Sequence, residues 1–177
     1  MEDQMLRRNA LGLSLAALLA LLGGGAPALA QGGPITEGIV GTWVLVSVVS
    51  QADDGTRGEP FGPGPKGVMI FTRDGHFSLF QSRAELPRLA ASDRARATPE
   101  EAMTVVRDSI AYYGTYAVDE TNRSLSITLE GSTYANLLGP SQRRIITSLT
   151  VNELQFSNPR TPSGMTLQTS WRRATPR

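Results

Sequence analysis

The 177-residue chain has no cysteine, one histidine and one lysine, and its formal net charge is only +1. Without cysteine there are no disulfides, so the stability of the fold must come from its own core. The single histidine, His76, argues against a histidine-rich metal site, and we expect neither a metal nor another cofactor. The arginines are spread along the chain and offset by acids, so we expect no nucleic-acid partner.

The sequence also lacks the motifs of several enzyme classes. It contains no cysteine nucleophile, no phosphate-binding loop, no H-E-x-x-H zinc motif and no G-x-S-x-G elbow in the mature chain. The acidic residues Asp53, Asp54 and Glu59 lie in a loop whose Gly, Pro and Asp content is typical of turns. Hydrolytic and metal-dependent enzymes are disfavoured, and we assign no catalytic residue.

The longest apolar run lies near the N-terminus and has the form of an export signal. Arg7 and Arg8 precede Ala10–Leu22, where all thirteen residues are Ala, Leu, Gly or Ser, and residues 28–30 read Ala-Leu-Ala. The run is shorter than the about 20 apolar residues that cross a bilayer. We therefore predict a signal peptide over residues 1–30, cleaved near its last alanine, and a periplasmic or secreted protein without a membrane anchor in its mature form.

The route of export and the size of the mature chain follow from the same segment. Met5 is an alternative start, and the arginine pair also fits a twin-arginine exporter, although Asn9-Ala10-Leu11 matches that signal poorly. Ordinary secretion is the favoured route. Cleavage after Ala30 leaves 177 minus 30 residues, or 147, which is the size of one domain whose oligomeric state the sequence leaves open.

Most of the remaining chain has the pattern of β-strands. Residues 39–51 are rich in valine, Asp74-Gly75 is a hairpin signal, and Leu125, Ile127 and Leu129 alternate with small polar residues. Short links between most strands favour antiparallel pairing. The expected strands are residues 39–51, 67–72, 76–82, 112–118, 123–130, 142–151, 153–157 and 165–173.

Two further segments flank or interrupt the strands. Residues 31–38 contain Gly and Pro and are predicted to form a flexible leader. Residues 98–101, Thr-Pro-Glu-Glu, form an N-cap, a proline at the first helical position and a capping box. Met103, Val106 and Ile110 then recur at helical spacing. This pattern predicts one helix, at about 99–111, inserted between the third and fourth strands.

Eight antiparallel strands must protect the edges of their sheet. Closure into a barrel removes the edges, and an eight-stranded barrel has room for one small ligand. A two-sheet sandwich is the structural alternative. We predict a mainly β domain over residues 39–175, an eight-stranded antiparallel barrel with one inserted helix.

The ordered motifs resemble the bacterial lipocalin-like domain family. Gly41-Thr42-Trp43 is similar to the G-x-W start of lipocalins, and Trp171-Arg172-Arg173 to their closing arginine. The resemblance implies a lipocalin-like barrel in an exported, single-domain member, but it implies no particular activity. Its other motifs are IFTRDGHFS (70–78), TPEEA (98–102), YYGTYAVDE (112–120), EGS (130–132), Gly139 and Gln142-Arg143.

The resemblance also implies a closing contact at the barrel floor. Trp43 and an arginine at the end of the last strand are expected to form a cation–π pair, worth about 0.5–2 kcal/mol. We assign this structural role to Arg172, while the choice between Arg172 and Arg173 depends on strand parity that the sequence leaves open.

Five residues are the candidates for a ligand-binding site. Glu130 ends one predicted strand and Gln142 and Arg144 open the next, so these side chains are expected to approach across the strand pair. Tyr112 and Tyr116 share one face of their strand by its period of two. The competing interpretations are a solvated salt bridge at the rim and ordinary strand tyrosines.

Three functions are compatible with these observations. The favoured one is binding of a small hydrophobic molecule inside the barrel, without catalysis. The second is an isomerase or cyclase that shapes an apolar substrate, with Glu130 and Tyr116 as its polar residues. The third is an interaction module that uses the segment Arg83–Arg96, which holds four arginines in fourteen residues. His76, beside a hairpin turn, is expected to be exposed.

Overall fold

The computed structural model describes residues 33–159, 161 and 164–175; the predicted signal peptide, residues 1–30, lies outside them. Within this part of the chain the helical elements are α1 (Ile35–Gly38), η1 (Arg94–Arg96), α2 (Pro99–Asp108) and η2 (Ala135–Leu137). The strands are β1 (Gly41–Gln51), β2 (Arg57–Gly58), β3 (Lys66–Phe71), β4 (His76–Ser82), β5 (Ser109–Asp119), β6 (Ser124–Ser132), β7 (Gln142–Leu149), β8 (Glu153–Asn158) and β9 (Thr166–Arg173).

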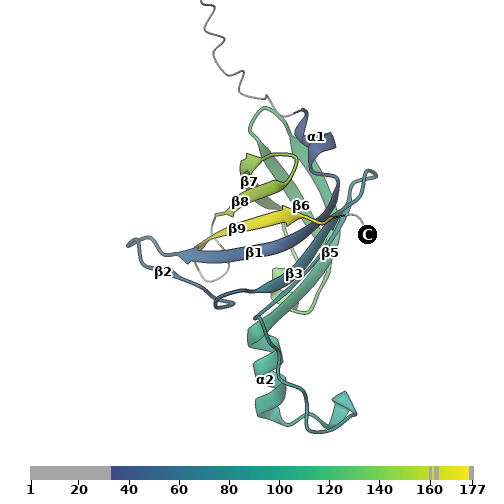
Figure 1. The fold of residues 1–177 in the computed structure, drawn as a ribbon, viewed down its shortest axis with the longest axis vertical. Helices are drawn as coiled ribbons and strands as arrows, with labels where there is room; N and C mark the ends of the chain where they lie inside the picture. The colour runs from purple at the N-terminus through teal and green to yellow at the C-terminus, as the bar shows by residue number, and fades with distance from the viewer. Residues whose placement is uncertain (1–32, 160, 162–163, 176–177) are drawn as a thin grey trace, which may run out of the picture. The chain divides into compact units, whose positions relative to one another are not determined.

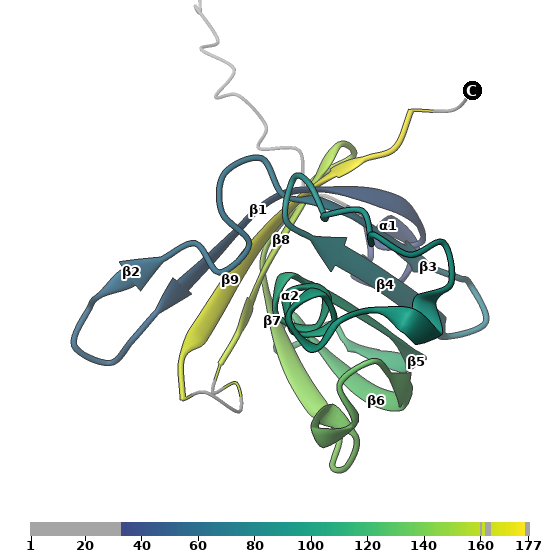
Figure 2. The same ribbon diagram turned by 90° about the horizontal axis from the view of Figure 1, so that it is seen from below.

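The strands form one closed antiparallel barrel. Each strand from β3 to β9 pairs with the next, and β1 pairs with both β3 and β9, which closes the ring (Figures 1 and 2). The predicted eight-stranded barrel is therefore confirmed, and the sandwich alternative is wrong. The two-residue strand β2 is an addition, paired with the end of β1 outside the ring.

The interior of the barrel is the hydrophobic core. In β6, Leu125, Ile127 and Leu129 are buried while Ser126 and Thr128 between them are exposed, as the alternation in the sequence predicts. The largest fully buried side chains come from five strands of the barrel and the turn before β1: Trp43, Trp171, Phe71, Ile39, Met69, Leu125 and Leu154. Burial of this kind stabilises by about 25 cal/mol per Å² of apolar surface, so the core can hold a fold without disulfides.

Part of the predicted flexible leader is folded, which corrects that prediction. Residues 35–38 form the helical turn α1, and the side chain of Ile35 is buried. The carboxylate of Glu120, in the β5–β6 turn, accepts hydrogen bonds from the backbone N–H of Ile35 at 3.0 Å and of Thr36 at 2.8 Å. Ile35 and Ile39 are four residues apart, so a helical turn places both against the barrel core.

The inserted helix α2 is shorter than predicted. Its capping box is present: Thr98 accepts from the N–H of Glu101, and the Glu101 side chain accepts from the N–H of Thr98. The helix ends at Asp108 because Ser109 pairs with Ser82 as the first residue of β5. No helix among the described residues is long and apolar enough to span a membrane.

Helix α2 packs little of its surface on the barrel. Met103 and Val106, expected on a core-facing helix surface, are each 63% exposed, and Ile110 belongs to β5 instead. Figure 1 shows α1 and α2 at opposite ends of the barrel, with α2 extending away from the strands. The helix is present as predicted, but the tertiary structure leaves Met103 and Val106 largely exposed.

Candidate functional site

One end of the barrel is closed by an arginine over a tryptophan. The Cζ atom of Arg173 lies 4.1 Å from the ring centroid of Trp43, a cation–π contact. The guanidinium donates to the backbone carbonyls of Val40 at 2.9 Å and Gly38 at 2.6 Å, and its Nε donates to that of Val151 at 2.5 Å. One side chain thus links α1, the residue before β1 and the β7–β8 turn by hydrogen bonds.

The closing arginine is therefore Arg173, and the assignment to Arg172 is wrong. Side chains alternate along a strand, and Trp171 points into the core, where it is 1% exposed. Arg173 consequently points inward as well, and Arg172 is exposed on the outer face. The alternation of side chains along β9 decides between these two arginines. It can be applied only when one residue of the strand is known to point into the barrel.

The glycine of the G-x-W motif makes room for this contact. Gly41 has a φ of +130°, a conformation that side chains with a Cβ rarely adopt. A Cβ atom at this position would lie 2.7 Å from Nη1 of Arg173, closer than van der Waals contact permits. The motif and the closing arginine are thus parts of one structure.

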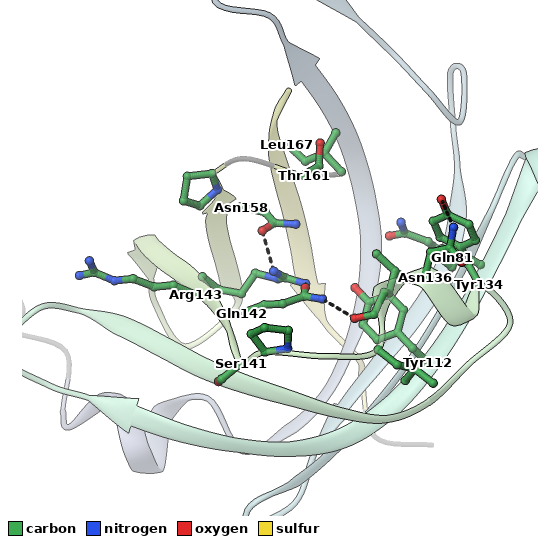
Figure 3. A pocket seen from close by; sticks show the side chains of 16 residues that line it. Gln81, Tyr112, Tyr134, Asn136, Ser141, Gln142, Arg143, Asn158, Thr161 and Leu167 are labelled. Carbon is green, nitrogen blue, oxygen red and sulfur yellow. Dashed lines mark hydrogen bonds between the residues drawn. The ribbon is translucent and has the colours of Figure 1, made fainter. Parts of the chain in front are cut away.

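The other end of the barrel is hollow. A cavity of about 750 Å³ is lined by residues from β4, β5, β7, β8, β9 and the β6–β7 connection (Figure 3). Leu167, near the start of β9, lines this cavity, whereas Arg173, at the end of the same strand, lies on Trp43. The cavity and the closed floor are therefore at opposite ends of β9.

The cavity forms where β6 and β7 separate. These strands pair only from Ser124 with Ile145 to Ile127 with Gln142, and β6 continues to Ser132 beside β5 alone. Residues 133–141, which include η2, connect the separated strand ends and supply part of the cavity wall. The opening is thus a consequence of a short β6–β7 ladder.

A network of polar side chains crosses the cavity wall. Arg144 of β7 is 4% exposed, and it donates from Nη1 to Oδ1 of Asn158 at 2.6 Å and from Nη2 to Oε1 of Gln142 at 2.9 Å. The Gln142 amide in turn donates to the carbonyl of Leu137 at 3.0 Å. Figure 3 shows these bonds as dashed lines at Asn158 and Gln142. The network links β7, β8 and η2.

A comparison with models of known protein families assigns the chain to a family. The family model described as a lipocalin-like domain matches residues 40–174, more than half of the sequence. The chain belongs to the lipocalin-like domain family. Its predicted resemblance to that family is confirmed.

Two solved structures are similar to this lipocalin-like chain. A lipocalin-like protein from Bacteroides uniformis is 14% identical, with a TM-score of 0.42; the match covers 77% of this chain and 99% of that one. A de novo designed fluorescence-activating β-barrel is 9% identical, with a TM-score of 0.40, and the match covers 80% and 98% respectively. A search of curated proteins found no match.

Three of the five predicted site residues meet in the cavity of this lipocalin-like domain. Tyr112, Gln142 and Arg144 all line it, although they come from two strands, β5 and β7, that do not pair with each other. The Tyr112 ring packs edge-on against Phe77 with centroids 6.1 Å apart. Tyr112 is thus part of both the cavity wall and the aromatic core.

Glu130 is not part of the cavity. It is exposed on the outer face of β6, because side chains alternate and Leu129 before it is buried. The register separates it further, since Gln142 pairs with Ile127, three residues before Glu130. The predicted approach of Glu130 to Gln142 and Arg144 is therefore wrong.

Tyr116 lies in the closed half of the barrel, where its contacts are those of a structural residue. Its hydroxyl donates to the carbonyl of Thr72 at 2.8 Å, and its ring meets Phe71 edge-on with centroids 4.9 Å apart. Burial raises the pKa of the Tyr116 hydroxyl, and the negative charge of Asp74 adds to this. Because Tyr116 faces inward and Glu130 outward, the residues considered for an isomerase do not come together.

The remaining candidates lie on the surface. His76 is exposed, as predicted, with Nδ1 3.3 Å from Oδ1 of Asp74. Hydrogen bonding from the Thr72 hydroxyl, followed by that from His76, lowers the pKa of Asp74. In the segment 83–96, Arg83 pairs with Asp108 at 3.1 Å, and its other three arginines are exposed. Its role as a partner surface stays a prediction.

Gln81 and Asn158 also line the cavity, although they were not among the candidates predicted from the sequence. Gln81 is 7% exposed and follows Phe77 and Leu79 on the inner face of β4, and Asn158 follows Leu154 and Phe156 on that of β8. The period of two would have placed both inside the barrel. Only the closed structure shows that these strand ends surround an open space.

Proposed function

We propose that this lipocalin-like protein binds a small, largely apolar molecule in the cavity at the open end of its barrel. The observation that carries the proposal is a cavity of about 750 Å³. Ligand pockets in proteins typically measure about 300–1,000 Å³ and combine an apolar wall with a few polar groups. The wall here has this composition, with Ile110, Leu137, Leu138 and Leu167 beside Tyr112 and Gln142.

The closed floor supports entry from one side only. Trp43 and Arg173 fill the opposite end, and Trp43 is fully buried. A bound molecule would therefore enter through the end formed by the β6–β7 connection and place its innermost part toward the aromatic core. This arrangement favours storage or transport of the ligand over its passage through the barrel.

We further propose that the protein works outside the cytoplasm. The support is the sequence of residues 1–30, with its arginine pair, apolar run and Ala-Leu-Ala end. Expression of the full chain in a bacterial host, followed by N-terminal sequencing of the periplasmic protein, is expected to find a start at Gln31. A cytoplasmic product with an intact N-terminus would contradict this part of the proposal.

The binding proposal is tested with Nile red, a neutral fluorophore whose emission rises in apolar surroundings. The purified mature protein is expected to bind it saturably. Leu167→Trp should fill part of the cavity and weaken binding at least about tenfold, the effect of about 1.4 kcal/mol. Val46→Trp is the matched control, because Val46 lies on the outside of β1 and is 52% exposed.

Two results would contradict the binding proposal. The first is the absence of saturable Nile red binding to the wild-type protein. The second is equal binding by the wild-type protein and a folded Leu167→Trp variant, which would place the fluorophore elsewhere on the molecule.

A further inference from the structure

The cavity contains a buried cation with neutral partners. The two acceptors of Arg144, Asn158 Oδ1 and Gln142 Oε1, are amide oxygens. The ion pairs among the described residues are His76 with Asp74 and Asp108 with both Arg83 and Arg107, and none includes Arg144. A guanidinium that is 4% exposed therefore lacks a carboxylate partner in the part of the chain that the structure describes.

The charged side chains in the described lining of the cavity are all positive. Its described lining includes Arg143 and Arg144 but no aspartate or glutamate. Arg143 is exposed, and Figure 3 shows its side chain extending away from the other labelled residues. The buried positive charge of Arg144 is thus the dominant charge facing the cavity.

An unpaired buried charge is costly in a protein interior. Burial of an ion without a counter-ion costs several kcal/mol, and neutral hydrogen bonds offset only part of this. Arg144 uses two of the five N–H donors of its guanidinium in the bonds to Asn158 and Gln142. These bonds hold the guanidinium at the cavity wall and leave donors for an acceptor that comes from outside the chain.

We infer that the molecule bound in the cavity is an anion: a monocarboxylate with an apolar tail, for which Arg144 is the counter-ion. The inference rests on the proposed binding function and specifies its ligand class. A carboxylate is planar and matches the guanidinium fork with two parallel hydrogen bonds. Ile110, Leu137 and Leu167 provide the apolar wall for the tail.

Two further side chains are placed to contact the carboxylate or the atoms next to it. Gln81 and Tyr112 line the same cavity as Arg144. Gln81 is buried as a residue, and among the described residues neither its side-chain amide nor the Tyr112 hydroxyl has a hydrogen-bond partner. Every side-chain N or O atom there that is fully shielded from solvent does have a partner, so these two groups are not fully shielded. Both groups therefore reach open space in the cavity and are free to donate to a ligand.

A purely structural role is the competing interpretation of Arg144. Its bond to Asn158 links β7 to β8, so the residue could serve only to hold the two strands together. In that case a substitution would lower stability without changing which ligands the cavity prefers. Ligand preference therefore separates the two roles, whereas stability alone does not.

The experiment compares decanoate with decanol by isothermal titration calorimetry at neutral pH. The two probes share one apolar tail and differ in charge. The wild-type protein is expected to bind decanoate at least about tenfold more tightly, the range of a charge-assisted hydrogen bond. Arg144→Leu is expected to abolish this preference and to leave decanol binding within a factor of about two. Arg172→Leu, at an exposed arginine on the outer face of β9 that does not line the cavity, is the matched control and should keep the preference.

Two supporting measurements keep the test decisive if Arg144→Leu does not fold. Arg144→Lys retains the charge but loses the planar fork, so the preference for decanoate should fall several-fold. Lowering the pH should weaken decanoate binding to the wild-type protein as the acid becomes protonated, while decanol binding stays constant.

The outcomes distinguish this inference from the binding proposal. Equal binding of decanoate and decanol to the wild-type protein, with saturable Nile red binding, overturns the anion inference and leaves the binding function intact. A preference that survives Arg144→Leu also overturns it and makes Arg144 structural. If neither probe nor Nile red binds, both proposals are wrong.

Discussion

Arg173 combines two kinds of contact at the barrel floor. Its guanidinium lies over the Trp43 ring and donates to the carbonyls of Gly38, Val40 and Val151. These carbonyls belong to the end of α1, the residue before β1 and the β7–β8 turn, where the regular hydrogen-bond ladders stop. One residue thereby satisfies acceptors that the strands themselves leave unpaired.

Replacing Arg173 should destabilise the protein far more than replacing its neighbour. Arg173→Ala removes the cation–π contact and three charge-assisted hydrogen bonds, and we expect a loss of about 2–4 kcal/mol in the free energy of unfolding. Arg172→Ala changes an exposed side chain and should cost less than about 0.5 kcal/mol. Urea denaturation of both variants measures the difference. Equal losses would contradict the assignment of the closing arginine.

At the scale of elements, α1 depends on a residue 85 positions away in the sequence. The Glu120 carboxylate accepts bonds from the first two N–H groups of α1 and from the Thr36 hydroxyl at 2.8 Å. These bonds, first the one from the Thr36 N–H, lower the pKa of Glu120. The negative charge also complements the positive N-terminal end of the helical turn.

The contribution of Glu120 should therefore depend on pH. A carboxylate whose pKa is lowered by folding stabilises the protein above its ordinary value of 4.5, and this is lost as the pH falls through the lower value of the folded state. Glu120→Gln should cost about 0.5–2 kcal/mol at pH 7, as for a helix cap, and progressively less below pH 4.5. Chemical denaturation as a function of pH measures this. Glu130→Gln, at an exposed position, is the control, and a cost of Glu120→Gln that persists in acid would contradict the mechanism.

The second helix should behave as an almost independent element. Because Met103 and Val106 of α2 are largely exposed, replacing both with glutamine should change the free energy of unfolding by less than about 0.5 kcal/mol each. Backbone amides of α2 should exchange with solvent faster than those of β5. Hydrogen-exchange mass spectrometry measures this. Strong protection of α2 would mean that its apolar face is covered in solution.

At the scale of the whole domain, closure of the ring couples the cavity to stability. Every strand from β3 to β9, together with β1, has neighbours on both sides, so the domain is expected to unfold as one unit. A ligand that binds only the folded barrel then raises the free energy of unfolding of the whole domain.

Ligand-linked stabilisation is the corresponding prediction. Decanoate at about 100 times its dissociation constant should add about 2.7 kcal/mol to the free energy of unfolding, which thermal denaturation detects as a higher Tm. The folded Leu167→Trp variant should show a much smaller increase at the same decanoate concentration. An equal increase in both proteins would indicate that decanoate acts outside the cavity.

The positions of the elements follow from local patterns in the sequence. The eight barrel strands lie where their periodicity predicts, and the capping box at Thr98 begins α2 as expected. These features depend on neighbours within about four residues, such as alternation along a strand or the bond between Thr98 and Glu101. Local interactions of this kind are readable without knowledge of the fold.

The contents of the site were decided by the tertiary structure. Register shifts lie between Leu45 and Ser47 in β1, between Leu129 and Gly131 in β6, and between Ile146 and Ser148 in β7, and they change which residues meet across each ladder. A bulge inserts one residue on one strand only, so parity counted along the sequence no longer predicts pairing.

Two residues illustrate the division. The sequence by itself determined a barrel with an arginine at its closing strand, but the inward direction of Trp171 decided that Arg173 and not Arg172 meets Trp43. The sequence also selected Arg144 as a site residue, whereas the meeting of β7 with β8 decided that its partner is Asn158 and not Glu130. Trp43 and Arg173 lie far apart in the chain, and only closure of the ring between β1 and β9 brings them into contact, whereas Arg144 and Asn158 meet because β7 pairs with β8 in one particular register.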